Sequence, residues 1–139
     1  MAMKRCCITN QLTECLMIHV YGGKEMAEPI DSILDSVKKI IGLSVTYDVF
    51  DPDLIMHINT AFFTLYQLGV TDTPFVITSS EETWDDFHAD ADLEAVKIYV
   101  GLKTRMYFDP PTNSALISAI NEQIKELEWR INVKVDPEN

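Results

Sequence analysis

A length of 139 residues and a hydrophobic fraction of 47% are typical of one globular domain that buries a modest core. The net charge of −11 argues against unassisted binding to nucleic-acid phosphates, which depends on clustered lysine and arginine side chains. The apolar runs are short and interrupted, far below the roughly 20 residues that span a bilayer, so no membrane partner is expected.

The first 25 residues are interpreted as an extension that lies upstream of the natural translation start, Met26. Met26 directly follows Gly-Gly-Lys-Glu, whose codons form a purine-rich run like that of a bacterial ribosome-binding site. A genuine N-terminal extension is the alternative. Without residues 1–25 the chain keeps 8 basic and 20 acidic residues, a net charge of −12.

All three cysteines lie within that extension, as Cys6, Cys7 and Cys15. Their spacing fits neither a metal-binding knuckle nor a disulfide framework. The same segment lacks the continuous apolar run and the cleavage site of a signal peptide. We therefore expect the protein in the reducing cytoplasm and not in the secretory pathway.

Two amphipathic helices are predicted next. Apolar residues at spacings of three and four between residues 30 and 41 form one helical face, and Gly42 ends that helix. The second helix is predicted to have Asp51 as its N-cap and Pro52 at its first position, and to end before Gly69. Its broad apolar face consists of Leu54, Ile55, Ile58, Ala61, Phe62, Leu65 and Leu68.

The helical period is lost between residues 70 and 92, which predicts a long structured loop. A single helical turn is expected around residues 81–87. Trp84 and Phe87 are three residues apart, and large aromatic side chains in a loop are expected to lie with their rings on the helices.

A third helix is predicted from Asp92 to Tyr107, ended by the Asp109-Pro110-Pro111 sequence. Its predicted face consists of Leu93, Val96, Val100, Lys103 and Tyr107, with Ala95, Tyr99, Leu102 and Met106 beside it. Thr112 or Asn113 is expected to cap a fourth helix. In that helix, apolar residues alternate at spacings of three and four, a seam that packs on one neighbouring helix; they are Ile117, Ile120, Ile124, Leu127 and Ile131.

The fold class predicted from these elements is all-α. Residues 26–132 are expected to form a four-helix domain with a long loop between the second and third helices. Val133 and Val135 alternate with polar residues, and Pro137 follows, which predicts that residues 133–139 form an exposed, extended C-terminal tail.

No pattern for an enzyme or a cofactor site is found. The three histidines are scattered, and the nucleophile-elbow, zinc and phosphate-loop motifs are absent, so neither catalytic activity nor a cofactor is expected. One segment is rich in acidic residues: Glu81, Glu82, Asp85, Asp86, Asp90 and Asp92. It lacks the alternating spacing and the glycine of a calcium loop, which favours a solvated, repulsive surface over a metal site.

Four stretches of the sequence carry a resemblance to a known family: DPDLIMHINTAFFTLYQLGV, ETWDDF, VKIYVGLKTRMYFDPP and IKELEWRINV. In their order and composition they resemble the small helical head-tail connector proteins of tailed bacteriophages. These proteins are also called head-completion adaptors and are common in prophages of Gram-positive bacteria. The likeness covers residues 26–138 and excludes the first 25 residues.

The resemblance implies a structural protein of the virion neck that is assembled in the bacterial cytoplasm. It implies a ring of about a dozen copies beneath the portal protein, closed by heterologous contacts. Such a ring extends the DNA channel, lets DNA pass without specific binding, and carries the next neck or tail protein. The isolated chain can be a monomer that the portal assembles into the ring.

The resemblance also suggests two surfaces. The C-terminal segment is expected to contact the portal through Trp129, Ile131, Val133 and Val135, with the tail adding to the partner by main-chain pairing. The acidic residues between 81 and 92 are expected to face either the channel or a neighbouring subunit, and the sequence does not decide between them. An acidic helical phage regulator or DNA-mimic binding module is the alternative function.

Overall fold

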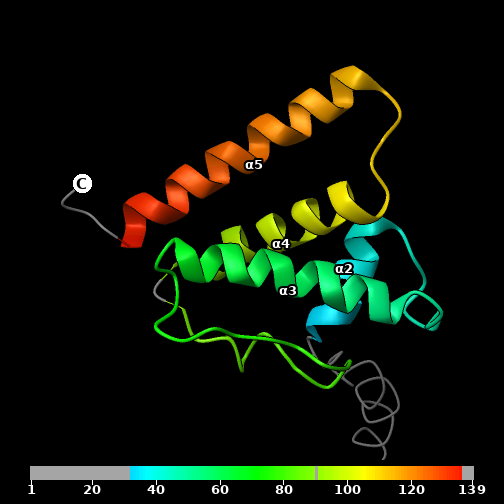
Figure 1. Cartoon of the computed structure of the whole chain (residues 1–139), viewed down its shortest axis with the longest axis horizontal. Coiled ribbons are helices and arrows are strands. Elements are labelled where there is room, and N and C mark those ends of the chain that lie inside the picture. The colour runs from blue at the N-terminus through cyan, green and yellow to red at the C-terminus, as the bar shows by residue number, and fades with distance from the viewer. Residues whose placement is uncertain (1–31, 90, 136–139) are drawn as a thin grey trace, which may run out of the picture. The chain divides into compact units, whose positions relative to one another are not determined.

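The computed structural model describes residues 32–89 and 91–135, and four helices form this part of the chain (Figure 1). They are α2 (Ile33–Ile41), α3 (Asp51–Gln67), α4 (Leu93–Phe108) and α5 (Ser114–Val135). The described ranges contain no strand, so the prediction of an all-α fold is confirmed. The interpretation of residues 1–25, including the three cysteines, lies outside the described residues.

The helix ends follow local signals that the sequence contains. Helix α2 begins after Ser32, whose hydroxyl accepts a hydrogen bond from the Asp35 N–H, and it ends at Gly42 with a φ of +96°. Only glycine adopts this left-handed conformation without steric cost. Helix α3 begins at Asp51, so the N-cap is Phe50 and the predicted cap was one residue late.

Helices α4 and α5 are also capped by residues next to their first turns. Asp92 accepts a hydrogen bond from the N–H of Glu94 at the start of α4. Asn113 Oδ1 accepts from the N–H groups of Ala115 and Leu116, which identifies Asn113 as the cap of α5. Each side chain satisfies amide donors that a helix leaves unpaired in its first turn.

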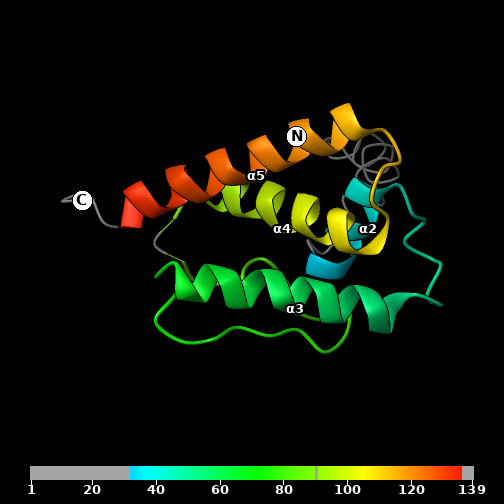
Figure 2. The ribbon, with the colours of Figure 1, turned by 45° about the horizontal axis from the view of Figure 1, so that its top comes forward.

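Helix α4 is the central helix. It packs against α2, α3 and α5, while α3 and α5 lie on its opposite sides (Figure 2). Val96, Tyr99, Val100 and Thr104 are buried on the side of α4 that these neighbours cover. Of the predicted face, Val96 and Val100 are buried, whereas Tyr107 is exposed near the end of the helix, where its ring lies against His57.

The loop between α3 and α4 closes the core with aromatic side chains, as predicted. Trp84 and Phe87 are buried and form ring contacts with Phe62, at centroid distances of 6.0 and 5.0 Å. The indole Nε1–H of Trp84 donates to Ser36 Oγ at 3.1 Å. One loop residue thus contacts both α2 and α3.

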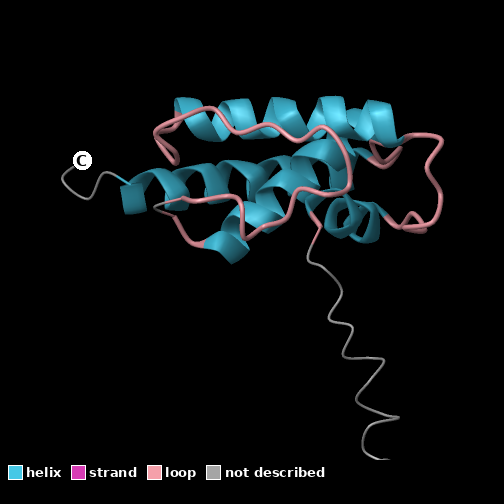
Figure 3. Ribbon diagram, turned by 90° about the horizontal axis from the view of Figure 1, so that it is seen from below, coloured by secondary structure: helices cyan, strands magenta, loops and turns pink. Residues whose placement is uncertain are grey.

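The first half of the same loop runs back along α3 (Figure 3). Asn59 holds it there with two hydrogen bonds to the backbone of Ile77: its Nδ2 donates to the carbonyl oxygen at 2.9 Å, and its Oδ1 accepts from the N–H at 2.8 Å. The Asn59 amide thus satisfies the backbone N–H and C=O of Ile77, which in a sheet would pair with a neighbouring strand.

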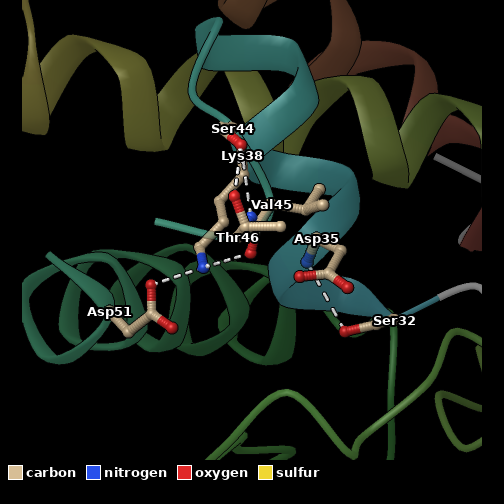
Figure 4. Close-up of polar contacts among 7 residues, drawn as sticks. All are labelled: Ser32, Asp35, Lys38, Ser44, Val45, Thr46 and Asp51. Carbon is tan, nitrogen blue, oxygen red and sulfur yellow. Dashed lines mark hydrogen bonds and ion pairs between the residues drawn. The ribbon is translucent and has the colours of Figure 1, made fainter. Parts of the chain in front are cut away.

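A buried ion pair joins α2 to the start of α3. The Lys38 side chain is only 2% exposed, and its Nζ lies 2.6 Å from Asp51 Oδ1 and 3.3 Å from the carbonyl oxygen of Val45, to which it donates (Figure 4). Both partners are needed, since a buried ammonium without a counter-charge is strongly destabilising.

The end of α5 corrects the predicted tail. Helix α5 continues through Val135, so Val133 and Val135 are helical and the extended segment expected from residue 133 was wrong for residues 133–135. Residues 136–139 lie outside the described part of the chain. Ile131 is buried in the core, as its place in the seam predicted, and this contradicts its second predicted role as a contact for the portal.

Candidate functional site

The C-terminal half of α5 separates the four residues predicted to contact the portal. Trp129 and Val133 lie one turn apart on the solvent side of the helix, and Trp129 is 65% exposed. Ile131 is buried, and Val135 packs against the core. We call Trp129 and Val133 the C-terminal face. It is an apolar patch on a regular helix and not on an extended tail.

A groove lies beside this half of α5, where it meets the first half of α4. Its volume is about 410 Å3. Ala95, Ile98, Leu127 and Ile131 supply its apolar lining, and its charged lining residues are Asp92, Glu94, Arg130 and Lys134. The sequence reading missed Ile98, which is exposed there. Its position off the predicted apolar face of the helix was the available signal.

A polar cluster fixes the C-terminal half of α5 to α4. Glu128 Oε1 accepts hydrogen bonds from the hydroxyl of Tyr99 at 2.9 Å and from Lys103 Nζ at 3.0 Å. Burial and the hydrogen bond to Glu128 raise the pKa of Tyr99 to about 12. Because Glu128 directly precedes Trp129, these bonds hold the C-terminal face in one orientation.

The predicted acidic surface is brought together only in part. Glu81 and Asp85 are exposed, and Asp90 lies outside the described residues. Asp86 accepts hydrogen bonds from the N–H and hydroxyl of Thr83, which hold the pKa of its carboxyl below the usual value. Asp86 shapes the turn that carries Trp84, and Asp92, as the cap of α4, has a similar local role.

Glu82 has the same kind of role in the preceding turn. Its two carboxylate oxygens accept hydrogen bonds from the N–H and hydroxyl groups of Thr78 and Ser79. Burial alone would raise the pKa of Glu82, but these hydrogen bonds lower it from 4.5 to about 2. The charged form of Glu82 therefore stabilises the folded loop.

We predict a pH dependence of stability that comes from Glu82. Since its pKa is lower in the folded chain, its contribution is present above pH 4.5 and is lost as the pH falls towards 2. The Glu82→Gln variant should lose this part of the dependence in urea unfolding measured from pH 5 to about 2. Glu81→Gln removes a charge from the same loop without touching these bonds. Equal pH profiles for the two variants would contradict the assignment.

The described residues offer no arrangement typical of an active site. Residues 32–89 and 91–135 contain no group of three or more histidine, aspartate or glutamate side chains placed to hold a metal ion. Over the same ranges no helix is long and apolar enough to cross a membrane. His57 lies against the ring of Tyr107, with 5.7 Å between centroids, which is a packing role.

The described fold is a small, acidic, all-helical domain with exposed apolar side chains on its helices and no recognisable catalytic centre among the described residues. A family model described as phage connector protein matches residues 33–138. The chain belongs to this family of structural phage proteins, so the resemblance noted in the sequence is confirmed. Searches of curated proteins and of solved structures found no match.

Proposed function

We propose that this chain is a head-tail adaptor that forms a ring of about a dozen copies beneath the portal. The ring extends the DNA channel and carries the next neck or tail protein. Membership of the phage connector family supports this role. The charge of −11 per chain supports it too, because a ring of acidic subunits repels the phosphates of the DNA that passes through it.

The single observation that carries the proposal is the C-terminal face. A tryptophan that is 65% exposed on a helix fixed by the Tyr99, Lys103 and Glu128 cluster is a preformed anchor for a protein partner. Because residues 133–135 are helical, the proposed contact is a helix laid into a groove of the portal and not strand addition. Val133 is the second anchor, one turn further along α5.

The acidic loop keeps a lesser part in the proposal. Glu81 and Asp85 are exposed, and they face the channel or the neighbouring subunit in the assembled ring. Glu82, Asp86 and Asp92 are engaged in local hydrogen bonds and contribute their charge without a direct contact.

The portal contact is tested by replacing Trp129 with alanine. Removal of a central aromatic anchor is expected to weaken binding to purified portal rings by about tenfold or more, measured by co-sedimentation. The fold should persist, because the side chain is exposed. Gln123→Ala, on the exposed surface of the same helix, is the matched control and should bind normally.

Equal binding by the Trp129→Ala variant would refute the C-terminal face as the contact. A wild-type chain that ignores the portal and captures a DNA-binding protein would instead support the acidic regulator. Truncation after Glu128 is not a clean test, because it also removes the buried Ile131 from the core.

A further inference from the structure

The outer face of α3 carries no charged residue. No Asp, Glu, Lys or Arg occurs between Asp53 and Asp72, although 24% of the whole chain is charged. Met56 and Phe63 lie on this face and are 56% and 55% exposed. Depletion of charge combined with exposed methionine and aromatic side chains is the composition of a protein interface.

The threonine hydroxyls of this face form hydrogen bonds with the backbone of α3 itself. The hydroxyl of Thr60 donates to the carbonyl oxygen of Met56 at 2.9 Å, and that of Thr64 donates to the carbonyl oxygen of Thr60 at 3.1 Å. Because these hydroxyls already have hydrogen-bond acceptors, another protein surface can cover the threonines without leaving an unpaired polar group. We call Met56, Thr60, Phe63 and Thr64 the α3 face.

A second uncharged surface is the first part of α5. No charged residue occurs between Asp109 and Glu122, and the first buried side chain of the helix is Ile120. The turns before it, residues 114–119, are largely exposed, including Leu116. These turns therefore present a surface that the rest of the described chain leaves largely uncovered.

The two uncharged surfaces lie on opposite sides of the molecule's central helix. Helix α4 lies between α3 and α5, and the backbones of α3 and α5 do not approach each other (Figure 2). Two different surfaces on opposite sides of each copy are what a head-to-tail contact requires, and such contacts close into rings.

We infer that the α3 face of one copy packs against residues 114–119 of the next copy. This inference rests on the proposed ring and names its subunit contact. The occupant is a second copy because chains of net charge −11 repel one another wherever acidic surfaces meet. These two helix surfaces can meet without placing like charges in contact. The small side chains of Ala115, Ser118 and Ala119 leave room for Met56 and Phe63.

Cross-linking in assembled particles tests the contact. Thr60→Cys and Ser118→Cys are combined in a chain whose Cys6, Cys7 and Cys15 are serine, and the chain is assembled with the portal of the same phage. Treatment with a short bismaleimide should give a ladder of dimers, trimers and higher multimers on a denaturing gel. Each single variant should stay monomeric, since the contact joins two different surfaces. Ser80→Cys with Ser118→Cys is the control and should also stay monomeric.

The outcomes separate this inference from the proposed function. Particles that contain the chain but give no ladder overturn the inference and leave the adaptor role standing. A dimer from Thr60→Cys alone also overturns it, because it shows that two α3 faces meet. Absence of the chain from the particles contradicts the proposed function itself.

A charge substitution provides the second measurement. Phe63→Glu places a carboxylate on the α3 face and should lower incorporation into particles by about tenfold, while the isolated variant stays folded. Ser80→Glu adds the same charge to an exposed loop residue and should incorporate normally. Equal incorporation of the two variants overturns the inference.

Discussion

Replacing Asp51 with alanine is expected to destabilise the fold by about 3 kcal/mol, because it leaves a buried lysine without its counter-charge. Lys38 is 2% exposed, and its ammonium lies 2.6 Å from the Asp51 carboxylate. The remaining hydrogen bond to the Val45 carbonyl oxygen cannot neutralise the charge. The measurement is the free energy of unfolding from urea denaturation at pH 7.

Two further variants isolate the cause of that loss. Lys38→Met replaces the ammonium with an apolar side chain of similar length and should cost much less, about 1 kcal/mol, since no buried charge remains. Combining it with Asp51→Ala should add little. If Asp51→Ala and Lys38→Met destabilise the chain equally, the loss comes from packing and not from an uncompensated charge.

Replacing Trp84 with alanine is expected to cost about 3–5 kcal/mol, the range for truncation of a large buried aromatic side chain. Trp84 is 1% exposed, contacts Phe62 on α3, and donates a hydrogen bond to Ser36 on α2. Its loss opens a cavity between the loop and two helices. The free energy of unfolding again provides the measurement.

The chain offers a matched control in its other tryptophan. Trp129→Ala removes the same side chain from an exposed position and should change stability by less than about 0.5 kcal/mol. Trp84→Phe keeps most of the apolar volume but loses the hydrogen bond to Ser36, and should lie between the two. Similar losses for Trp84→Ala and Trp129→Ala would contradict the different burial of the two residues.

The helix ends could be predicted because each depends on a local residue. Gly42 supplies a left-handed conformation, while Asp92 and Asn113 accept hydrogen bonds from N–H groups a few positions away. The predicted N-cap of α3, Asp51, was wrong by one residue because proline is tolerated at more than one position of the first helical turn. The burial of Trp84 followed from its size.

The features that the sequence reading missed depend on distant partners. Asn59 and Ile77 are 18 residues apart, and nothing local shows that an amide side chain will hold that loop. The burial of Thr104 on α4 was not predicted, because apolar spacing passes over a polar residue. Lys38 did leave a signal: it lies four residues after Leu34 and three before Ile41, within the apolar face of α2.

The candidate site was predicted in part. Trp129 is exposed, as its predicted role in a partner contact requires. Ile131 faces the core because it lies seven residues after Ile124, two helical turns further along the buried seam. A short alternation of apolar and polar residues, such as Val133-Lys134-Val135, occurs in strands and at helix ends alike, and here it belongs to a helix. The uncharged faces of α3 and α5 emerged only when the packing showed which sides remain exposed.

The central claim is that this chain forms a ring on the portal, and electron microscopy of the two purified proteins mixed together tests it most directly. Class averages should show the portal ring with an added annulus on one end, frequent with the wild-type chain and much rarer with Trp129→Ala at the same concentration. Portal rings that look the same with and without the wild-type chain, at concentrations well above those in a cell, would contradict the claim.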